Sequence, residues 1–170
     1  MFESAELGHK IDKARYQEEM PELRQALLDA QYELREKGDF PLIILINGFD
    51  GAGRGETLHQ LNEWMDPRLI QVSAETALFS SSEESAQRPW MWRYWNALPP
   101  KGRTGVFFGS WYSDVLFGRV YDKTDEKQAM LQIGQILAFE KKLCAEGALI
   151  LKFWFHLSKE KQKKRLKSLE

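Results

Sequence analysis

Four short runs of apolar residues alternate along the chain with longer segments of helical pattern. The runs are PLIILIN (41–47), LIQVSA (69–74), TGVFFGSWY (104–112) and ALILKFWFHL (148–157). The first run shows no alternation of apolar and polar residues, which is typical of a strand buried on both faces. Strands that alternate with helices form a parallel sheet with helices on both sides. The pattern therefore predicts one domain, a three-layer α/β/α sandwich with a mainly parallel central sheet.

A long helix is predicted ahead of the first strand, within the first 38 residues. Pro21 suits its first turn, and Gly38 suits the cap at its C-terminal end. Apolar residues recur there at alternating spacings of four and three, which gathers them on one helical face: Tyr16, Met20, Leu23, Leu27, Ala30 and Leu34. We expect this face to pack on the rest of the domain. The alternative is that it forms a dimer contact.

The remaining helices are predicted at 56–65, 87–102, 125–146 and 158–170. The polar stretch 79–85 suits the start of the second of these helices, and Ser158 suits the N-cap of the last. Inward-facing apolar residues are predicted on the first and third helices: Leu58, Leu61 and Met65, then Met130, Ile133, Leu137 and Leu143.

Composition narrows the class of protein. A length of 170 residues and a hydrophobic content of 43% suffice for one domain with its own core, and a net charge of −1 is unlike that of nucleic-acid binders. No apolar stretch approaches the roughly 20 residues that span a bilayer. The start MFESAELGHK lacks the apolar segment of a signal peptide, and the single Cys144, expected to be buried, fits a reducing compartment. We expect a cytoplasmic protein without nucleic-acid or membrane partners.

The C-terminal segment is the one strongly basic part of the sequence. From Lys152 to Glu170 there are seven basic residues and two acidic ones. Such a segment is either a solvated helix face or a surface that attracts a polyanion. The sequence leaves both interpretations open.

A glycine-rich loop, NGFDGAGRGET (47–57), directly follows the first predicted strand. A loop of this kind between a strand and a helix gathers backbone N–H groups and a helix N-terminus around one small volume, which attracts phosphate. In the usual Walker A pattern, GxxxxGK[ST], the lysine reaches the terminal phosphates and the hydroxyl holds Mg²⁺. Here Gly48 and Gly53 match the glycines, while Arg54 replaces the lysine and Gly55 the hydroxyl residue.

The loop supplies the candidate site residues. A guanidinium can bind phosphate with two hydrogen bonds, although Arg54 is bulkier than lysine. Asp50 would help to hold Mg²⁺ between phosphates, or would only form the turn. Asp50 and Arg54 are therefore the catalytic candidates, and Asp50 is the metal candidate. The phosphate-binding candidates are Gly51, Ala52, Gly53, Arg54, Gly55 and Glu56. The alternative is a glycine turn that binds no ligand.

Several separated segments together resemble one enzyme family. They are the strand followed by G-x-D-x-x-G-[KR]-G (48–55), MDPR (65–68), RPWMWRYWNALPPKG (88–102), SWY (110–112) and KFWFHLSKEKQKKR (152–165). On these residues the chain resembles the second family of polyphosphate kinases from residue 12 onwards. Within it, the chain is similar to the N-terminal half of tandem-domain polyphosphate:AMP phosphotransferases. Family members are P-loop proteins that use Mg²⁺ to move phosphoryl groups between inorganic polyphosphate and nucleotides.

The chain departs from the family pattern at three places that carry charge. Arg54 stands where the family has lysine, and SDV (113–115) stands where it has Asn-Arg-Ala. The family's F-D-R-S-W-Y reads FFGSWY here, so that Phe108 replaces the aspartate and Gly109 the arginine. Losing one such charged group typically costs about 10²–10³-fold in rate. The resemblance therefore implies a catalytically degenerate domain. The family domain also continues through a lid, so residues 1–170 would be one P-loop domain without its lid or a second domain.

The resemblance implies a part of an enzyme that makes ADP from AMP and polyphosphate. Gly51, Gly53 and Gly55 would shape the cradle, Arg54 would hold phosphate, and Asp50 would be the remaining ligand of Mg²⁺. The domain would support polyphosphate binding or assembly, as a homo-oligomer or against a second kinase domain. One alternative is an active polyphosphate-dependent nucleotide kinase with Arg54 in place of lysine. The other is a non-catalytic dimerisation module.

The aromatic segment 87–102 carries two further candidates. Its aromatic side chains either stack on nucleobases or pack in the core, and their helical spacing favours the core. In the family, arginines of this segment lie near the phosphate channel, so the resemblance implies that Arg88 and Arg93 contact polyphosphate. Asp114, beyond the third strand, is expected to be a solvated surface acid.

Overall fold

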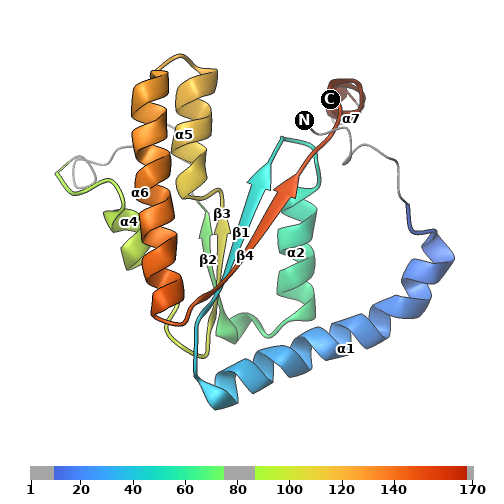
Figure 1. Ribbon diagram of the computed structural model, residues 1–170. Helices are drawn as coiled ribbons and strands as arrows, with labels where there is room; N and C mark the ends of the chain where they lie inside the picture. Colours follow the sequence, from blue (N-terminus) through green and yellow to red (C-terminus); the bar gives the residue numbers. More distant parts are fainter. Residues whose placement is uncertain (1–9, 75–86, 168–170) are drawn as a thin grey trace.

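The computed structural model describes residues 10–74 and 87–167 (Figure 1). Within these ranges one parallel sheet contains β1 (Leu42–Gly48), β2 (Ile70–Ala74), β3 (Thr104–Phe108) and β4 (Leu149–Phe155). The strand order is β2-β3-β1-β4, which places β1 between β3 and β4. Helices lie on both faces of this sheet. The predicted α/β/α sandwich is confirmed.

The core lies on both faces of β1, because alternate residues of a strand point to opposite sides. On one face α2 (Arg54–Trp64) covers the sheet, and on the other α5 (Trp111–Val120) and α6 (Glu126–Ala145) lie side by side (Figure 1). The cluster under α5 and α6 includes Ile43, Leu45, Phe107, Trp111, Ile136 and Phe139. The cluster under α2 includes Ile44, Ile46 and Val106, with Leu58 and Leu61 packed against them.

The long helix α1 (Lys13–Lys37) starts earlier than predicted. The Asp12 carboxylate accepts a hydrogen bond from the Arg15 backbone N–H at 2.9 Å and caps the helix, so Pro21 lies inside it and not in its first turn. Gly38 ends the helix as predicted, in the left-handed conformation with φ of 61°. In Figure 1 the N-terminal part of α1 extends away from the sheet. Of the predicted apolar face, Leu34 is buried but Tyr16 and Leu23 are exposed.

Two other helices differ from their predictions. The segment 87–102 forms only the short helix α4 (Trp92–Asn96). Pro89 excludes its preceding residue from helical geometry, and Pro99 stops the helix at the other end. In α6 the prediction holds for two of its four inward residues: Leu143 is buried and Ile133 packs against the core, but Met130 and Leu137 are 65% and 57% exposed. The buried apolar residues of α6 are Ala129, Ile136, Phe139 and Leu143.

Three remaining expectations have separate outcomes. Cys144 is exposed, not buried. The polar stretch 79–85 lies outside the described residues. Among the helices of the described ranges, none has both the length and the apolar character needed to cross a membrane.

Strand register places the glycine loop at the carboxyl edge of the sheet. Gly48, the last residue of β1, pairs with Phe155, the last residue of β4, and Ile46 pairs with Phe108 at the end of β3. The backbone of Gly48 has φ of 133°, and a Cβ there would lie 2.1 Å from the Phe155 carbonyl oxygen. Only glycine fits this close approach, which brings the loop against the end of β4.

Polar contacts on Asp66 fix the C-terminal part of α1. The Gln31 amide donates to the Asp66 carbonyl oxygen at 3.0 Å, and the Tyr32 hydroxyl donates to its carboxylate at 3.0 Å. Arg68, in the 3₁₀ turn η2 (Pro67–Leu69), donates to the same carboxylate. The Arg68 bonds hold the pKa of Asp66 well below its ordinary value of 3.8, with a smaller contribution from Tyr32.

We therefore expect an acid-dependent loss of stability that Asp66→Asn removes. A carboxyl group whose folded-state pKa is lowered contributes stability above its unfolded pKa, and this contribution is lost as pH falls towards the folded value. Urea midpoints of both proteins, measured from pH 6 down to pH 2, should fall less steeply below about pH 4 for Asp66→Asn. Parallel slopes would contradict the assignment.

We also expect Gly48→Ala to destabilise the fold by on the order of 3 kcal/mol, because the new Cβ meets backbone and the φ angle is strained. The matched control is Gly134→Ala in the middle of α6, where an added Cβ has no neighbour within 4 Å. That change should stabilise the protein by about 0.5–1 kcal/mol, since alanine favours the helix. Urea unfolding measures both. Equal effects at the two glycines would contradict the close approach.

Candidate phosphate-binding site

The glycine loop presents the N-terminus of α2 without a side-chain cap. Gly53 occupies the N-cap position with φ of 103° and makes no side-chain hydrogen bond to the helix. Gly51 also has a positive φ, of 76°. The first N–H groups of a helix have no partner within the helix, and they attract an anion when no side chain caps them. The predicted candidates from Gly51 to Glu56 therefore lie together, around the start of α2.

Arg54 is held from two sides. Its guanidinium forms an ion pair with the Asp50 carboxylate, four residues earlier. It also lies over the Phe108 ring, with 5.3 Å between the guanidinium carbon and the ring centroid. The Arg54 side chain is 18% exposed, whereas that of Asp50 is 79% exposed. The structure thus brings the two catalytic candidates together, with Phe108 beneath the arginine.

The C-terminal helix α7 (Lys159–Lys167) lies against this loop (Figure 1). The Gln162 amide donates to the Asp50 carbonyl oxygen at 3.0 Å, and Arg165 pairs with Glu56 at 2.9 Å. The Leu166 side chain lies beside Gly51, where an added Cβ would be 3.7 Å from it. The basic tail is therefore next to the glycine loop. The charge of this segment was visible in the sequence, but its position beside the loop could not be predicted from the sequence.

Two polar residues that sequence reasoning missed join the ends of β1 and β3. The Asn47 side-chain amide donates to the Ser110 hydroxyl at 3.0 Å, and this hydroxyl donates to Oδ1 of the same Asn47 side chain at 3.1 Å. Ser110 also caps α5 through a reciprocal pair of hydrogen bonds with Ser113. The serine of SWY thus fixes the start of α5 beside the loop.

A buried acid links α5, α6 and β4 below the loop. Glu140 accepts hydrogen bonds from the Trp111 indole at 3.0 Å, the Tyr112 hydroxyl at 2.9 Å and the Lys152 ammonium at 2.6 Å. Burial raises the pKa of Tyr112. Burial alone lowers the pKa of Lys152, but its bonds to Glu140 and Tyr112 outweigh this effect, so its pKa is raised. The cluster keeps Lys152 charged and anchors the strand that leads to α7.

Arg88 and Arg93 lie with the aromatic segment. The Arg88 guanidinium lies over the Trp92 ring, 4.3 Å from its centroid. Arg93 forms an ion pair with Asp114 and donates to the Tyr94 hydroxyl at 2.8 Å. Asp114 is thus half-buried and paired, and the expectation of a solvated surface acid is wrong. Contact of either arginine with polyphosphate stays a prediction.

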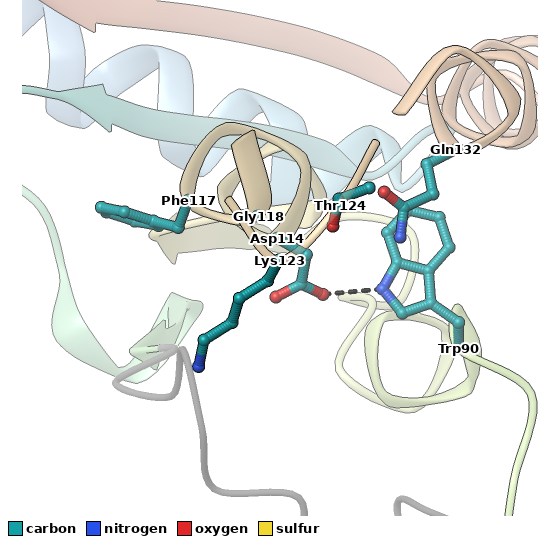
Figure 2. A pocket seen from close by; sticks show the side chains of 7 residues that line it. All are labelled: Trp90, Asp114, Phe117, Gly118, Lys123, Thr124 and Gln132. Carbon is teal, nitrogen blue, oxygen red and sulfur yellow. Dashed lines mark hydrogen bonds between the residues drawn. The ribbon is translucent and has the colours of Figure 1, made fainter. Parts of the chain in front are cut away.

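A cavity of about 240 Å³ lies beside this cluster, between α5, α6 and the segment before α4. Figure 2 shows its lining: Trp90, Asp114, Phe117, Gly118, Lys123, Thr124 and Gln132. The Trp90 indole donates to the Asp114 carboxylate at 2.6 Å. Tyr94 is fully buried and serves core packing, whereas Trp95 packs edge-on against Phe139 but is 48% exposed.

The resemblance leaves Asp50 as the remaining ligand of Mg²⁺, and the end of β3 adds no second acid beside it. Magnesium in kinases is held by carboxylates beside the phosphates. Here the Asp50 carboxylate is paired with Arg54, and the end of β3 carries the aromatic Phe108. Within the described ranges no three histidine, cysteine, aspartate or glutamate residues gather where they could hold a metal ion.

Comparisons with known proteins agree with this arrangement. The chain is 56% identical over all 170 residues to a polyphosphate:AMP phosphotransferase of Pseudomonas aeruginosa, and 32% identical over 85% of its length to one of Acinetobacter johnsonii. It covers 34% and 31% of these relatives, so it spans about a third of their length.

Solved structures give the same result. A crystal structure of a putative polyphosphate kinase 2 from Pseudomonas aeruginosa superposes with a TM-score of 0.92 at 55% identity, covering 98% of this chain and 36% of that one. Polyphosphate Kinase 2 from Arthrobacter aurescens gives 0.87 at 28% identity, covering 95% and 58%. The family model Polyphosphate kinase 2 matches residues 10–170. The chain belongs to the polyphosphate kinase 2 family.

Proposed function

We propose that this chain is the polyphosphate-binding part of a polyphosphate:AMP phosphotransferase, an enzyme that transfers a phosphoryl group from inorganic polyphosphate to AMP and releases ADP. The uncapped N-terminus of α2, with Arg54 at its first position, carries the proposal. Relatives that are 56% and 51% identical over the whole chain bear the name of this activity, which supports it.

Binding would start from the backbone. The first-turn N–H groups of α2 supply donors for phosphate oxygens, and the positive end of the helix dipole favours an anion. Arg54 would leave Asp50 and bind the phosphate with two hydrogen bonds, since a guanidinium suits this geometry. The basic residues of α7 would extend the attraction along the polymer. Their helix already lies against the loop through Gln162 and Arg165.

Catalysis by this part alone would be weak. Phosphoryl transfer depends on charges placed around the moving group. In this chain Arg54 stands at the position of the lysine. Phe108 at the end of β3 replaces an acid, and Gly109 after it replaces an arginine. Each missing charged group costs about 10²–10³-fold in rate. The role that remains is to capture polyphosphate and to support assembly with a second kinase domain.

One observation favours an additional role in self-association. The N-terminal half of α1 exposes the apolar side chains of Tyr16, at 42%, and Leu23, at 53%, and Ile11 just before the helix is 63% exposed. A second copy could cover this surface. Sedimentation of the wild type and of Leu23→Glu would test it, because an interface through α1 predicts that the charged variant is monomeric.

Polyphosphate binding should depend on Arg54. We expect Arg54→Ala to raise the dissociation constant for polyphosphate by about tenfold or more, because a charge-assisted hydrogen bond contributes about 1.5–3 kcal/mol. The matched control is Arg15→Ala, which removes the same charge from an exposed Arg–acid pair four residues apart on α1. Isothermal titration calorimetry measures both. Equal affinities for the two variants would contradict a site at the loop.

Turnover should be absent or very slow. We expect purified chain mixed with AMP, polyphosphate and Mg²⁺ to form no more ADP than Arg54→Ala does, since too few of the charges that catalyse transfer are present. Chromatographic detection of ADP over time is the measurement. Sustained turnover by the wild type that Arg54→Ala abolishes would overturn the degenerate assignment and favour an active kinase with arginine in place of lysine.

A further inference from the structure

We infer that this chain binds polyphosphate without a divalent cation, with Arg54 and α7 supplying the positive charge that a metal ion would otherwise bring. The inference rests on the proposed function and deepens it, because it specifies that the ligand is polyphosphate free of bound metal ions. Two features carry it: the side chains around Arg54, and the charge of the helix beside the loop.

The first feature is the aromatic ring at the end of β3. Phe108 pairs in register with Ile46, so its position is fixed by the sheet at the edge where the loop begins. Its ring lies under the Arg54 guanidinium at 5.3 Å, which is a cation–π distance. A benzyl side chain has no oxygen to offer a metal. Instead it supports a cation, so the group stabilised at this position is the arginine itself.

The remaining acid opposes the bound anion. Asp50 pairs with Arg54, although its own side chain is 79% exposed. With no second acid at Phe108 to share a metal, the Asp50 carboxylate competes with phosphate for the same guanidinium. If this carboxylate competes with phosphate for Arg54, removing it should strengthen polyphosphate binding. If it holds a metal ion that bridges to the phosphate, removing it should weaken binding.

The second feature is the charge of α7. The helix Lys159–Lys167 contains six basic residues and one acid. Arg165 pairs with Glu56 in the first turn of α2, which offsets the negative charge of this acid. The surface beside the loop is therefore cationic without any metal.

Magnesium should weaken binding to such a surface. Mg²⁺ bound to polyphosphate lowers its negative charge, and electrostatic attraction to a cationic site falls with that charge. A site with carboxylate ligands compensates for the weaker attraction, because the carboxylates coordinate the polyphosphate-bound ion. A site made of Arg54 and α7 has no such ligands. Whether Mg²⁺ strengthens or weakens polyphosphate binding therefore distinguishes a metal-binding site from a cationic one.

The test is calorimetric titration of the chain with a polyphosphate of defined length, in EDTA and in millimolar Mg²⁺ at matched ionic strength. We expect the dissociation constant in EDTA to be lower than that in Mg²⁺. Binding that is as tight or tighter in Mg²⁺ would overturn the inference and leave the proposed function standing. Binding in neither buffer would overturn the proposed function, and the inference with it.

Asp50→Asn sharpens the result. We expect it to lower the dissociation constant in EDTA by about fivefold, because it frees Arg54 and removes a repulsive charge. The matched control is Glu33→Gln on α1, which removes the same charge from an exposed ion pair four residues apart and should leave affinity unchanged. Weaker binding of Asp50→Asn in Mg²⁺ would show a bridging carboxylate and overturn the inference.

Phe108→Asp tests the opposite change. A carboxylate at this position would attract Arg54 and repel phosphate, so we expect the dissociation constant in EDTA to rise by about tenfold and Mg²⁺ to recover part of the loss. Unchanged binding would contradict the role given to the ring. A melting curve checks that this variant folds, and the exposed Asp50→Asn decides the question if it does not.

Discussion

The burial of β1 on both faces is the constraint on which the other features depend. β1 pairs with β3 on one side and β4 on the other, and its alternate side chains enter two separate clusters. Because the strand cannot shift without exposing one cluster, the position of its last residue is fixed. Gly48 ends it against the Phe155 carbonyl, and the loop leaves the sheet from that point. The start of α2 and the position of Arg54 follow from it.

At the loop, the two residues that depart from the family pattern, Arg54 and Phe108, contact each other. An arginine in place of lysine would be a single conservative change, but here its guanidinium is paired with Asp50 and lies on Phe108. The ring occupies the strand end where the family places an acid. Arginine and phenylalanine contact each other here as a cation on an aromatic face. The chain thus keeps the shape of a phosphate loop with a different distribution of charge.

The contact between α7 and the loop gives the basic tail a place in the site. Glu140 anchors β4 through Lys152, and β4 leads directly to α7. Gln162 then reaches the loop backbone at Asp50. A segment that is remote in sequence therefore contributes charge beside the start of α2. This positive charge beside the loop is what the proposed capture of a long polyanion relies on.

The sequence by itself determined the strands, the parallel sheet, the glycine loop and its departures from the family, because these depend on local periodicity and on residue type. The predicted start of α1 was wrong, because the prediction placed Pro21 in the first turn and did not recognise Asp12 as the N-cap. On α6 the sequence pattern placed Leu143 in the core correctly but also placed Met130 there, which is exposed. Only the tertiary structure decided which charges meet: Asp50 with Arg54, Asp114 with Arg93, and α7 with the loop. Apart from the short-range Asp50–Arg54 pair, these contacts join residues far apart in the chain, and long-range packing, not local pattern, sets them.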